Sequence, residues 1–272
     1  MNFLTVKRIS AFLTRYIYAV FSCLYLFLVG FLFEENRLFI DHICAHFGFA
    51  KKTPIPIVPT IEMAAVVSED IPIQVREPVD IDGNISLAEI AVMSKLVKRY
   101  NPKRLFEIGT FDGRTTLNLA ANAPADAEVY TLDLSKEKLF ETALPLEAGE
   151  EKYIEKDASG VRFLETDCQQ KITQLYGDSA TFDFSPFFNT VDFIFVDGSH
   201  SYEYVLNDSK LALELLRDGQ GVILWHDYGK PWWTGLTTAL NEMYSAGKEF
   251  KNIQHIQGTS LVYLVIDDSR GK

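Results

Sequence analysis

Residues 106–113 read FEIGTFDG and residues 130–134 read YTLDL, and these two stretches decide the fold. The first is an apolar run that ends in glycines, which let the backbone turn tightly and approach a ligand closely. The second ends at Asp133, a carboxylate that can accept hydrogen bonds from both hydroxyls of a ribose. Gly109 and Asp133 are 24 positions apart, close to the roughly 20 expected of one strand–helix–strand unit. Either signal alone is more often structural than functional.

On both sides of these stretches, short apolar segments alternate with segments of helical periodicity. This alternation predicts an α/β fold with a doubly wound, mostly parallel sheet of seven strands. A hairpin at the end of the chain makes one of these seven strands antiparallel. In such a sheet ligands bind beyond the carboxyl ends of the strands. Strands are expected at 104–109, 128–134, 172–176, 191–197, 221–225, 253–256 and 261–266, and helices at 113–123, 202–216 and 232–244.

The N-terminal part of the chain differs in composition from this body. Residues 16–33, YIYAVFSCLYLFLVGFLF, hold 18 uncharged residues, the lower limit for a membrane span. We therefore expect residues 1–50 to form a hydrophobic helix that anchors the protein in a membrane; a buried core helix and a cleaved signal peptide are the alternatives. Residues 51–82 contain five prolines, which predicts an extended linker. Residues 83–272 are the predicted folded domain.

Composition bounds the remaining possibilities. Hydrophobic residues make up 47% of the 272 residues, as in a globular protein with a core. The formal net charge is −11 and no Lys/Arg cluster stands out, so we expect no nucleic-acid partner. The three cysteines are Cys23, Cys44 and Cys168, and their odd number and wide spacing disfavour a disulfide framework or a zinc site.

A second group of polar residues follows two neighbouring strands. One strand ends in Val196-Asp197-Gly198-Ser199-His200 and the next in Trp225-His226-Asp227-Tyr228. Asp197 and Asp227 offer hard oxygen ligands to a divalent cation. His200 titrates near neutrality and could act as a general base. The alternative is structural, with Asp197 capping the next helix and His200 packing in a turn.

The combination resembles the class I S-adenosylmethionine-dependent methyltransferases over residues 85–267. The second group of residues resembles the metal-dependent O-methyltransferases that act on catechols or on sugars of macrolide type, and the Asp-Gly-Ser-His run is especially similar to the sugar enzymes. The resemblance implies catalytic roles for His200 and Asp197, and a Mg²⁺ site at Asp197 and Asp227. One departure leaves the metal open: the family commonly has an acidic or amide residue beside its second Asp, where this chain has His226 and Tyr228. The cofactor residues implied are Glu107, Gly109, Thr110, Gly113, Asp133 on the ribose and Asp178 on the adenine side.

The function implied by the resemblance is methyl transfer from S-adenosylmethionine to a hydroxyl of a small molecule or sugar. Since that cofactor is cytosolic, the domain of a membrane-anchored protein would face the cytoplasm. Two alternatives remain: a membrane-tethered, non-catalytic Rossmann-like binding domain, and a nucleotide-dependent oxidoreductase. The missing third glycine of the dinucleotide fingerprint disfavours the oxidoreductase.

Overall fold

The computed structural model describes residues 3–47, 53–67, 70–79 and 81–267, and the chain divides into two compact units, Met1–Thr53 and Pro54–Lys272. The first unit is helical: α1 (Phe3–Leu28), a 3₁₀ turn (Gly30–Leu32) and α2 (Glu34–His46). A side chain from the first turn of α2 bonds this 3₁₀ turn: the Asn36 amide donates to the carbonyl oxygen of Gly30 at 3.1 Å.

The prediction of a transmembrane anchor is wrong, and so is the membrane localisation that depended on it. The apolar run of residues 16–33 is not one helix, because α1 ends at Leu28 and the chain turns through Gly30–Leu32. A span needs about 20 consecutive apolar residues in a continuous helix. Among the residues that the structure describes, no helix combines the length and the apolar character that crossing a membrane requires.

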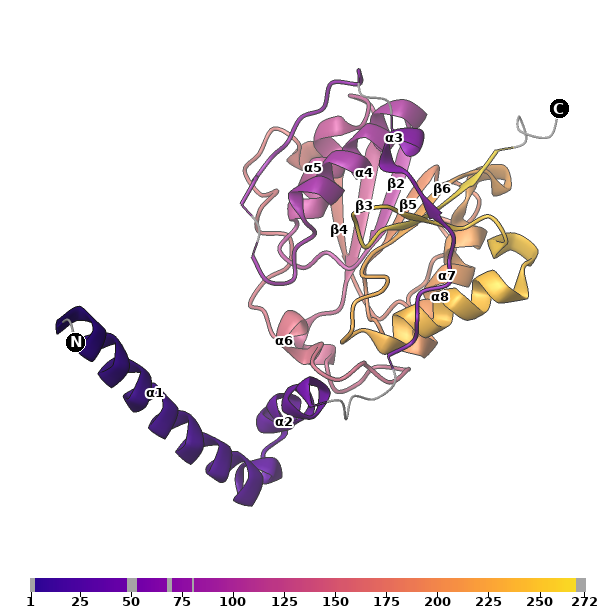
Figure 1. The fold of residues 1–272 in the computed structure, drawn as a ribbon. Helices are drawn as coiled ribbons and strands as arrows, with labels where there is room; N and C mark the ends of the chain where they lie inside the picture. The colour runs from indigo at the N-terminus through magenta and orange to yellow at the C-terminus, as the bar shows by residue number, and fades with distance from the viewer. Residues whose placement is uncertain (1–2, 48–52, 68–69, 80, 268–272) are drawn as a thin grey trace. The chain divides into compact units, whose positions relative to one another are not determined.

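The second unit contains an eight-stranded sheet in the order β1-β7-β8-β6-β5-β2-β3-β4 (Figure 1). All pairs are parallel except those of β8, which runs antiparallel to β6 and β7. The predicted mostly parallel α/β sheet with a closing hairpin is confirmed. The strands are β1 (Thr60–Ile61), β2 (Arg104–Ile108), β3 (Glu128–Asp133), β4 (Ile172–Tyr176), β5 (Phe193–Val196), β6 (Gly221–Trp225), β7 (Gln254–Ile256) and β8 (Val262–Ile266).

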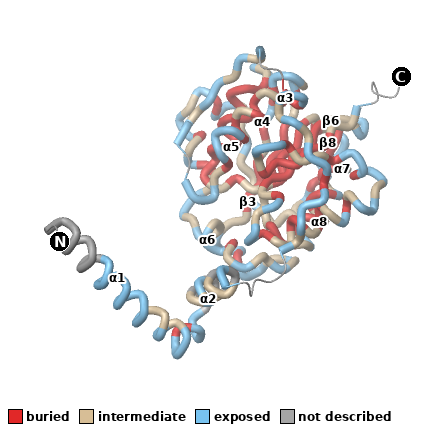
Figure 2. Tube along the Cα trace, in the orientation of Figure 1, coloured by how far each residue is buried: buried red, intermediate tan, exposed pale blue. Residues whose placement is uncertain are grey.

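Helices cover both faces of the sheet, as the alternating pattern requires (Figure 1). Side chains that alternate along each strand enter two separate cores: Phe106 packs with α7 and α8, whereas Leu105 packs with α4 and α5. The buried residues accordingly lie at the centre of the unit (Figure 2). The helices are α3 (Met63–Val66), α4 (Leu87–Tyr100), α5 (Arg114–Asn122), α6 (Glu151–Ile154), α7 (Tyr202–Leu215) and α8 (Thr234–Ala246).

Local signals set the ends of α4. Ser86 is the N-cap, and its side chain and that of Glu89 form a capping box, which satisfies two otherwise unpaired N–H groups of the first turn. Asn101 ends the helix in the left-handed conformation, just before Pro102, which disfavours further helix. The Glu89 side chain also accepts a hydrogen bond from the Ser260 backbone N–H, in the turn between β7 and β8, at 2.7 Å. The cap therefore ties α4 to the β7–β8 hairpin.

Part of the segment expected to be a linker packs against the domain. β1 pairs with β7, and Val58 is buried in the core. Farther along, the side-chain amides of Asn118 and Asn122 on α5 bond the backbones of Arg76 and Gln74 at 2.8–3.0 Å. Residues 54–67, 70–79 and 81–82 thus run along the domain and lead into its first long helix.

Candidate active site

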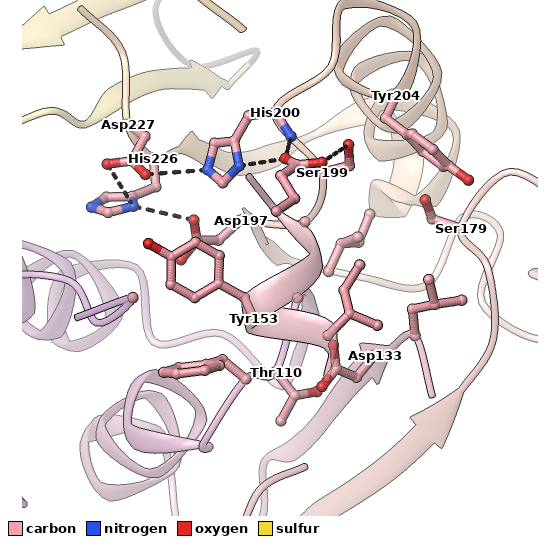
Figure 3. A pocket seen from close by; sticks show the side chains of 18 of the residues that line it. Thr110, Asp133, Tyr153, Ser179, Asp197, Ser199, His200, Tyr204, His226 and Asp227 are labelled. Atoms are coloured by element: carbon pink, nitrogen blue, oxygen red, sulfur yellow. Dashed lines mark hydrogen bonds and ion pairs between the residues drawn. The ribbon is translucent and has the colours of Figure 1, made fainter. Parts of the chain in front are cut away.

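A cavity of about 250 Å³ lies where the parallel strands end at their carboxyl side (Figure 3). The loops after β2, β3, β4, β5 and β6 all contribute to its wall, because parallel strands present their carboxyl ends at the same edge. Seven of the residues predicted from the sequence line it: Gly109, Thr110, Asp133, Asp178, Asp197, His200 and Asp227.

At Gly109 the backbone lies directly against the backbone of a neighbouring strand end. It follows β2 with φ +98°, and a Cβ there would lie 2.0 Å from the backbone oxygen of Asp197. Its N–H donates to the Leu132 carbonyl oxygen at 2.8 Å. The turn therefore fits between the ends of β3 and β5, and only glycine fits at this point.

Gly109→Ala should lower the free energy of unfolding by about 3 kcal/mol, from the clash and the positive φ together. Gly258→Ala is the matched control, because its φ is +80° but nothing lies within 4 Å of its Cβ position, so it carries the backbone strain alone. Urea unfolding of both variants tests this. Equal losses in the two would mean that the close approach at Gly109 is unimportant.

Glu107 and Gly113 are not among the residues that line the cavity. The Glu107 side chain is fully buried and accepts hydrogen bonds from the hydroxyls of Thr131, at 2.6 Å, and Thr116. Burial raises the pKa of Glu107 to about 8, although those two hydrogen bonds act to lower the pKa. Gly113 is the N-cap of α5, with φ +86°, and packs against Phe163. Both residues therefore pack inside the protein, next to the turn that follows β2, and do not face the cavity.

The raised pKa of Glu107 predicts a pH dependence of stability. The folded protein keeps a proton that the unfolded chain releases above its usual pKa, so stability falls as the pH rises from about 4.5 to about 8. The expected slope is about 1.4 kcal/mol per pH unit. Glu107→Gln, which cannot ionise, should reduce the measured slope by this amount in denaturant titrations across this range. Glu128→Gln, at the exposed start of β3, should leave it; an unchanged slope in Glu107→Gln would contradict the assignment.

Asp133 lies on the other side of the cavity from His226 (Figure 3), and Asp178 also lines the cavity. One oxygen of Asp133 contacts the Lys156 ammonium at 2.8 Å and accepts from the Ser159 hydroxyl at 2.5 Å. Burial raises the pKa of Asp133 despite these partners. Asp178 accepts from the Tyr204 hydroxyl at 2.8 Å and from the Ala143 N–H at 2.7 Å.

His226 lies among carboxylates at the opposite end of the cavity. Its Nδ1 is 3.1 Å from Asp197 and 3.4 Å from Asp227, and its Nε2 is 3.3 Å from Glu89. Burial lowers the pKa of His226, but the attraction of Asp197 and Asp227 outweighs it and holds the pKa well above its usual value. Asp227 has φ +62°, an uncommon conformation for a residue other than glycine and one that often marks a functional site.

His200 is held between two carboxylates (Figure 3). Its Nε2 is 3.1 Å from Asp227 and its Nδ1 is 2.7 Å from Glu150. The ring stacks on Trp233, with centroids 4.2 Å apart and planes at 9°. Burial lowers the pKa of His200, but the two carboxylates outweigh it and raise the pKa to about 9. In this arrangement His200 is protonated at neutral pH.

Asp197, His226 and Asp227 could hold a metal ion together, because one potential ligand atom of each lies within 4.8 Å of the others. Charge also fits: Glu89, Glu150, Asp197 and Asp227 face two imidazoles, so the carboxylates exceed even two imidazolium ions by two charges. Sequence reasoning did not propose His226 as a candidate ligand because the resemblance expects an oxygen ligand there. Its place between two Asp side chains appears only in the fold.

The description "methyltransferase domain" belongs to the family model that matches residues 106–228, the stretch that supplies most of the cavity wall. These residues are similar to that family. The sheet found above, mostly parallel with an antiparallel closing strand, is of the Rossmann-like kind. The matched stretch runs from β2 to the end of β6, so the paired clusters at Asp197 and Asp227 both fall inside it.

Two plant enzymes are similar in sequence to this chain. A flavonoid 3',5'-methyltransferase of Vitis vinifera is 30% identical over 154 residues, 56% of this chain and 57% of that protein. A caffeoyl-CoA O-methyltransferase of Petunia hybrida is 30% identical over 149 residues, 54% of this chain and 53% of that protein. The chain thus spans about half the length of these curated relatives.

Among solved structures, an S-adenosylhomocysteine-bound methyltransferase of Podospora anserina superposes with a TM-score of 0.49 at 19% identity. The superposition covers 69% of this chain and 81% of that one.

Proposed function

We propose that the protein transfers the methyl group of S-adenosylmethionine to a hydroxyl oxygen of a small molecule. The observation that supports this best is the shared cavity, which Gly109 lines and which has Asp133 on one side and the cluster around His200 and Asp227 on the other (Figure 3). A nucleoside-binding end and a proton-accepting end thus open onto the same space. Methyl transfer needs this arrangement, because the acceptor oxygen, the methyl carbon and the sulfur must lie in line.

The cofactor end is suited to an adenosyl group. Gly109 has no side chain between its backbone and the cavity, and Asp133 offers carboxylate oxygen to ribose hydroxyls. Lys156 already contacts Asp133, so the ribose would share that carboxylate with the ammonium. Asp178 and Ser179 follow β4 and would lie beside the base.

The acceptor end is suited to removing a proton. In the reaction a C–O bond forms, the C–S bond breaks, and the hydroxyl proton must go to a base. His200 is our candidate, with its ring plane fixed by the stacked Trp233. Since its pKa is about 9 while both carboxylates face it, the base role requires Asp227 to turn away from Nε2. The relatives named for flavonoids and caffeoyl-CoA support a phenolic acceptor, and the exposed Trp232 at the cavity offers a surface for a planar ring.

A divalent cation at Asp197, His226 and Asp227 fits the donor atoms and the charge excess of the cluster. When bound, the cation would partly neutralise the negative charge of the Asp227 carboxylate and polarise an acceptor hydroxyl. A site with two carboxylates suits Mg²⁺ or Mn²⁺, and the imidazole nitrogen favours Mn²⁺ over Mg²⁺. We therefore expect a chelator to abolish turnover, Mn²⁺ to restore it more fully than Mg²⁺, and Asp197→Asn to prevent restoration. Chelator-resistant turnover would remove the cation from the mechanism.

The test of the function as a whole is binding followed by transfer. S-adenosylmethionine and S-adenosylhomocysteine should raise the melting temperature of the purified protein, and NAD should not. Methyl-labelled S-adenosylmethionine should then label a member of a panel of catechols, flavonoids and sugars. A shift with NAD alone would favour an oxidoreductase. Binding without transfer to any hydroxyl would favour a binding domain.

A further inference from the structure

The chain between β3 and β4 brings a glutamate to the acceptor end of the cavity. Glu150 immediately precedes α6 (Glu151–Ile154), far from His200 in sequence, yet its carboxylate contacts that residue directly. The side chain is buried, with the residue 3% exposed. A buried carboxylate is costly unless it is fully paired, so its partners indicate what it does.

The Glu150 carboxylate contacts His200 and its neighbour Ser199, and it also accepts from the chain just before it. Oε1 accepts from the backbone N–H of His200 and pairs with its Nδ1 at 2.7 Å. Oε2 accepts from the Ser199 hydroxyl at 2.7 Å and from the Glu147 N–H at 3.0 Å. Both the backbone and the ring of His200 are thus bound by one oxygen. With Trp233 against the ring face, the ring has one orientation, and its Nε2 points toward Asp227.

We propose that Glu150 is a positioning residue, which keeps the proton on Nδ1 of His200 and so leaves Nε2 as the atom that exchanges a proton with the acceptor. The proposal rests on the function proposed above. A carboxylate that bonds the distal nitrogen of a catalytic imidazole fixes its tautomer and orientation. Glu150 lines the cavity, but both of its carboxylate oxygens already accept hydrogen bonds from the protein. It would act only through His200.

A purely structural role would have a different signature. The same segment carries Lys156 and Ser159, which contact Asp133 at the cofactor end. If Glu150 only anchored this segment, its loss would disturb Asp133 and weaken cofactor binding. A positioning role instead predicts that cofactor affinity stays and turnover falls.

The experiment compares Glu150→Ala and His200→Ala singly and together, in the full-length protein. Glu151→Ala is the matched control, because its carboxylate accepts from the Gly149 N–H and not from His200. We expect Glu150→Ala to lower kcat about 10- to 100-fold, by analogy with other partners of functional histidines, with the dissociation constant for S-adenosylhomocysteine and the KM for cofactor nearly unchanged. In the His200→Ala background it should cause no further loss, because both changes remove the same function.

Nitrogen-15 NMR of the histidine rings provides a readout that needs no activity. The Nδ1 proton of His200, assigned by its absence in His200→Ala, should be observed in the wild type and lost in Glu150→Ala. If no acceptor is ever turned over, this signal still tests the Glu150–His200 bond, so failure of the proposed function is distinguishable from failure of this inference.

Three results would overturn the inference: full turnover in Glu150→Ala, losses that add in the double variant, or an Nδ1 proton that persists without Glu150. If Glu150→Ala does not fold, Glu150→Gln replaces it at the same volume. A backbone N–H faces each carboxylate oxygen, so an amide cannot satisfy both, and we expect the same loss of kcat.

Discussion

Replacement of Asp133 by alanine should weaken the binding of S-adenosylhomocysteine about 100-fold, because two hydrogen bonds from ribose hydroxyls to a charged acceptor are lost. Asp133 is the last residue of β3 and lines the cavity opposite the acceptor cluster. Isothermal calorimetry on wild type and variant measures the change directly. Because the carboxylate is nine-tenths buried, few other groups can substitute for it.

The control for this prediction is on the same strand. Glu128 begins β3, and its side chain is 52% exposed and paired with Arg104. Glu128→Ala therefore removes the same charge from the far end of the strand and should leave affinity unchanged. Lys156→Met removes the ammonium that contacts Asp133. It therefore tests whether the loss of affinity comes from breaking this ion pair rather than from losing the hydrogen bonds to the ribose. Equal affinities for wild type and Asp133→Ala would show that the nucleoside is bound elsewhere.

His200→Ala should lower turnover about 10²- to 10⁴-fold, the usual contribution of a general base, while cofactor affinity stays within about twofold. The contacts of the His200 ring are with Asp227, Glu150 and Trp233, at the acceptor end of the cavity. The measurement is kcat under saturating cofactor and acceptor, with cofactor affinity from calorimetry on the same samples.

His255 offers the comparison for this substitution. It lies on β7, bonds the Thr259 carbonyl oxygen at 2.7 Å, and is not among the residues that line the cavity. His255→Ala should leave kcat unchanged. Undiminished turnover in His200→Ala would assign proton removal to another group and leave His200 as a structural partner of Glu150.

The parts of the fold that could be predicted were those with local causes. The apolar runs of β2, β5 and β6 are determined by neighbouring residues, and all three strands are present as expected. β1 was missed because it has two residues and exists only through its pairing with β7, almost 200 positions away. The membrane anchor was wrong because hydropathy does not show where a helix ends; α1 ends at Leu28, before the apolar run does.

At the site, strand ends predicted which residues would gather but not their partners. Gly109, Asp133 and Asp197 could be placed at the cavity because each directly follows or ends a parallel strand. Glu107 is at a strand end too, yet strand alternation turns it toward Thr116 and Thr131, away from the cavity. The contacts of Glu150 and Lys156 depend on the path of the long chain between β3 and β4, which no local pattern specifies.

A crystal structure of the protein with S-adenosylhomocysteine tests the central claim most directly. We expect one ligand in the cavity, with its ribose hydroxyls on Asp133 and its sulfur directed toward His200. The part of the ligand that faces the protein backbone should lie beside Gly109. A ligand bound outside this cavity, or a cavity that stays without ligand at saturating concentration, would contradict it.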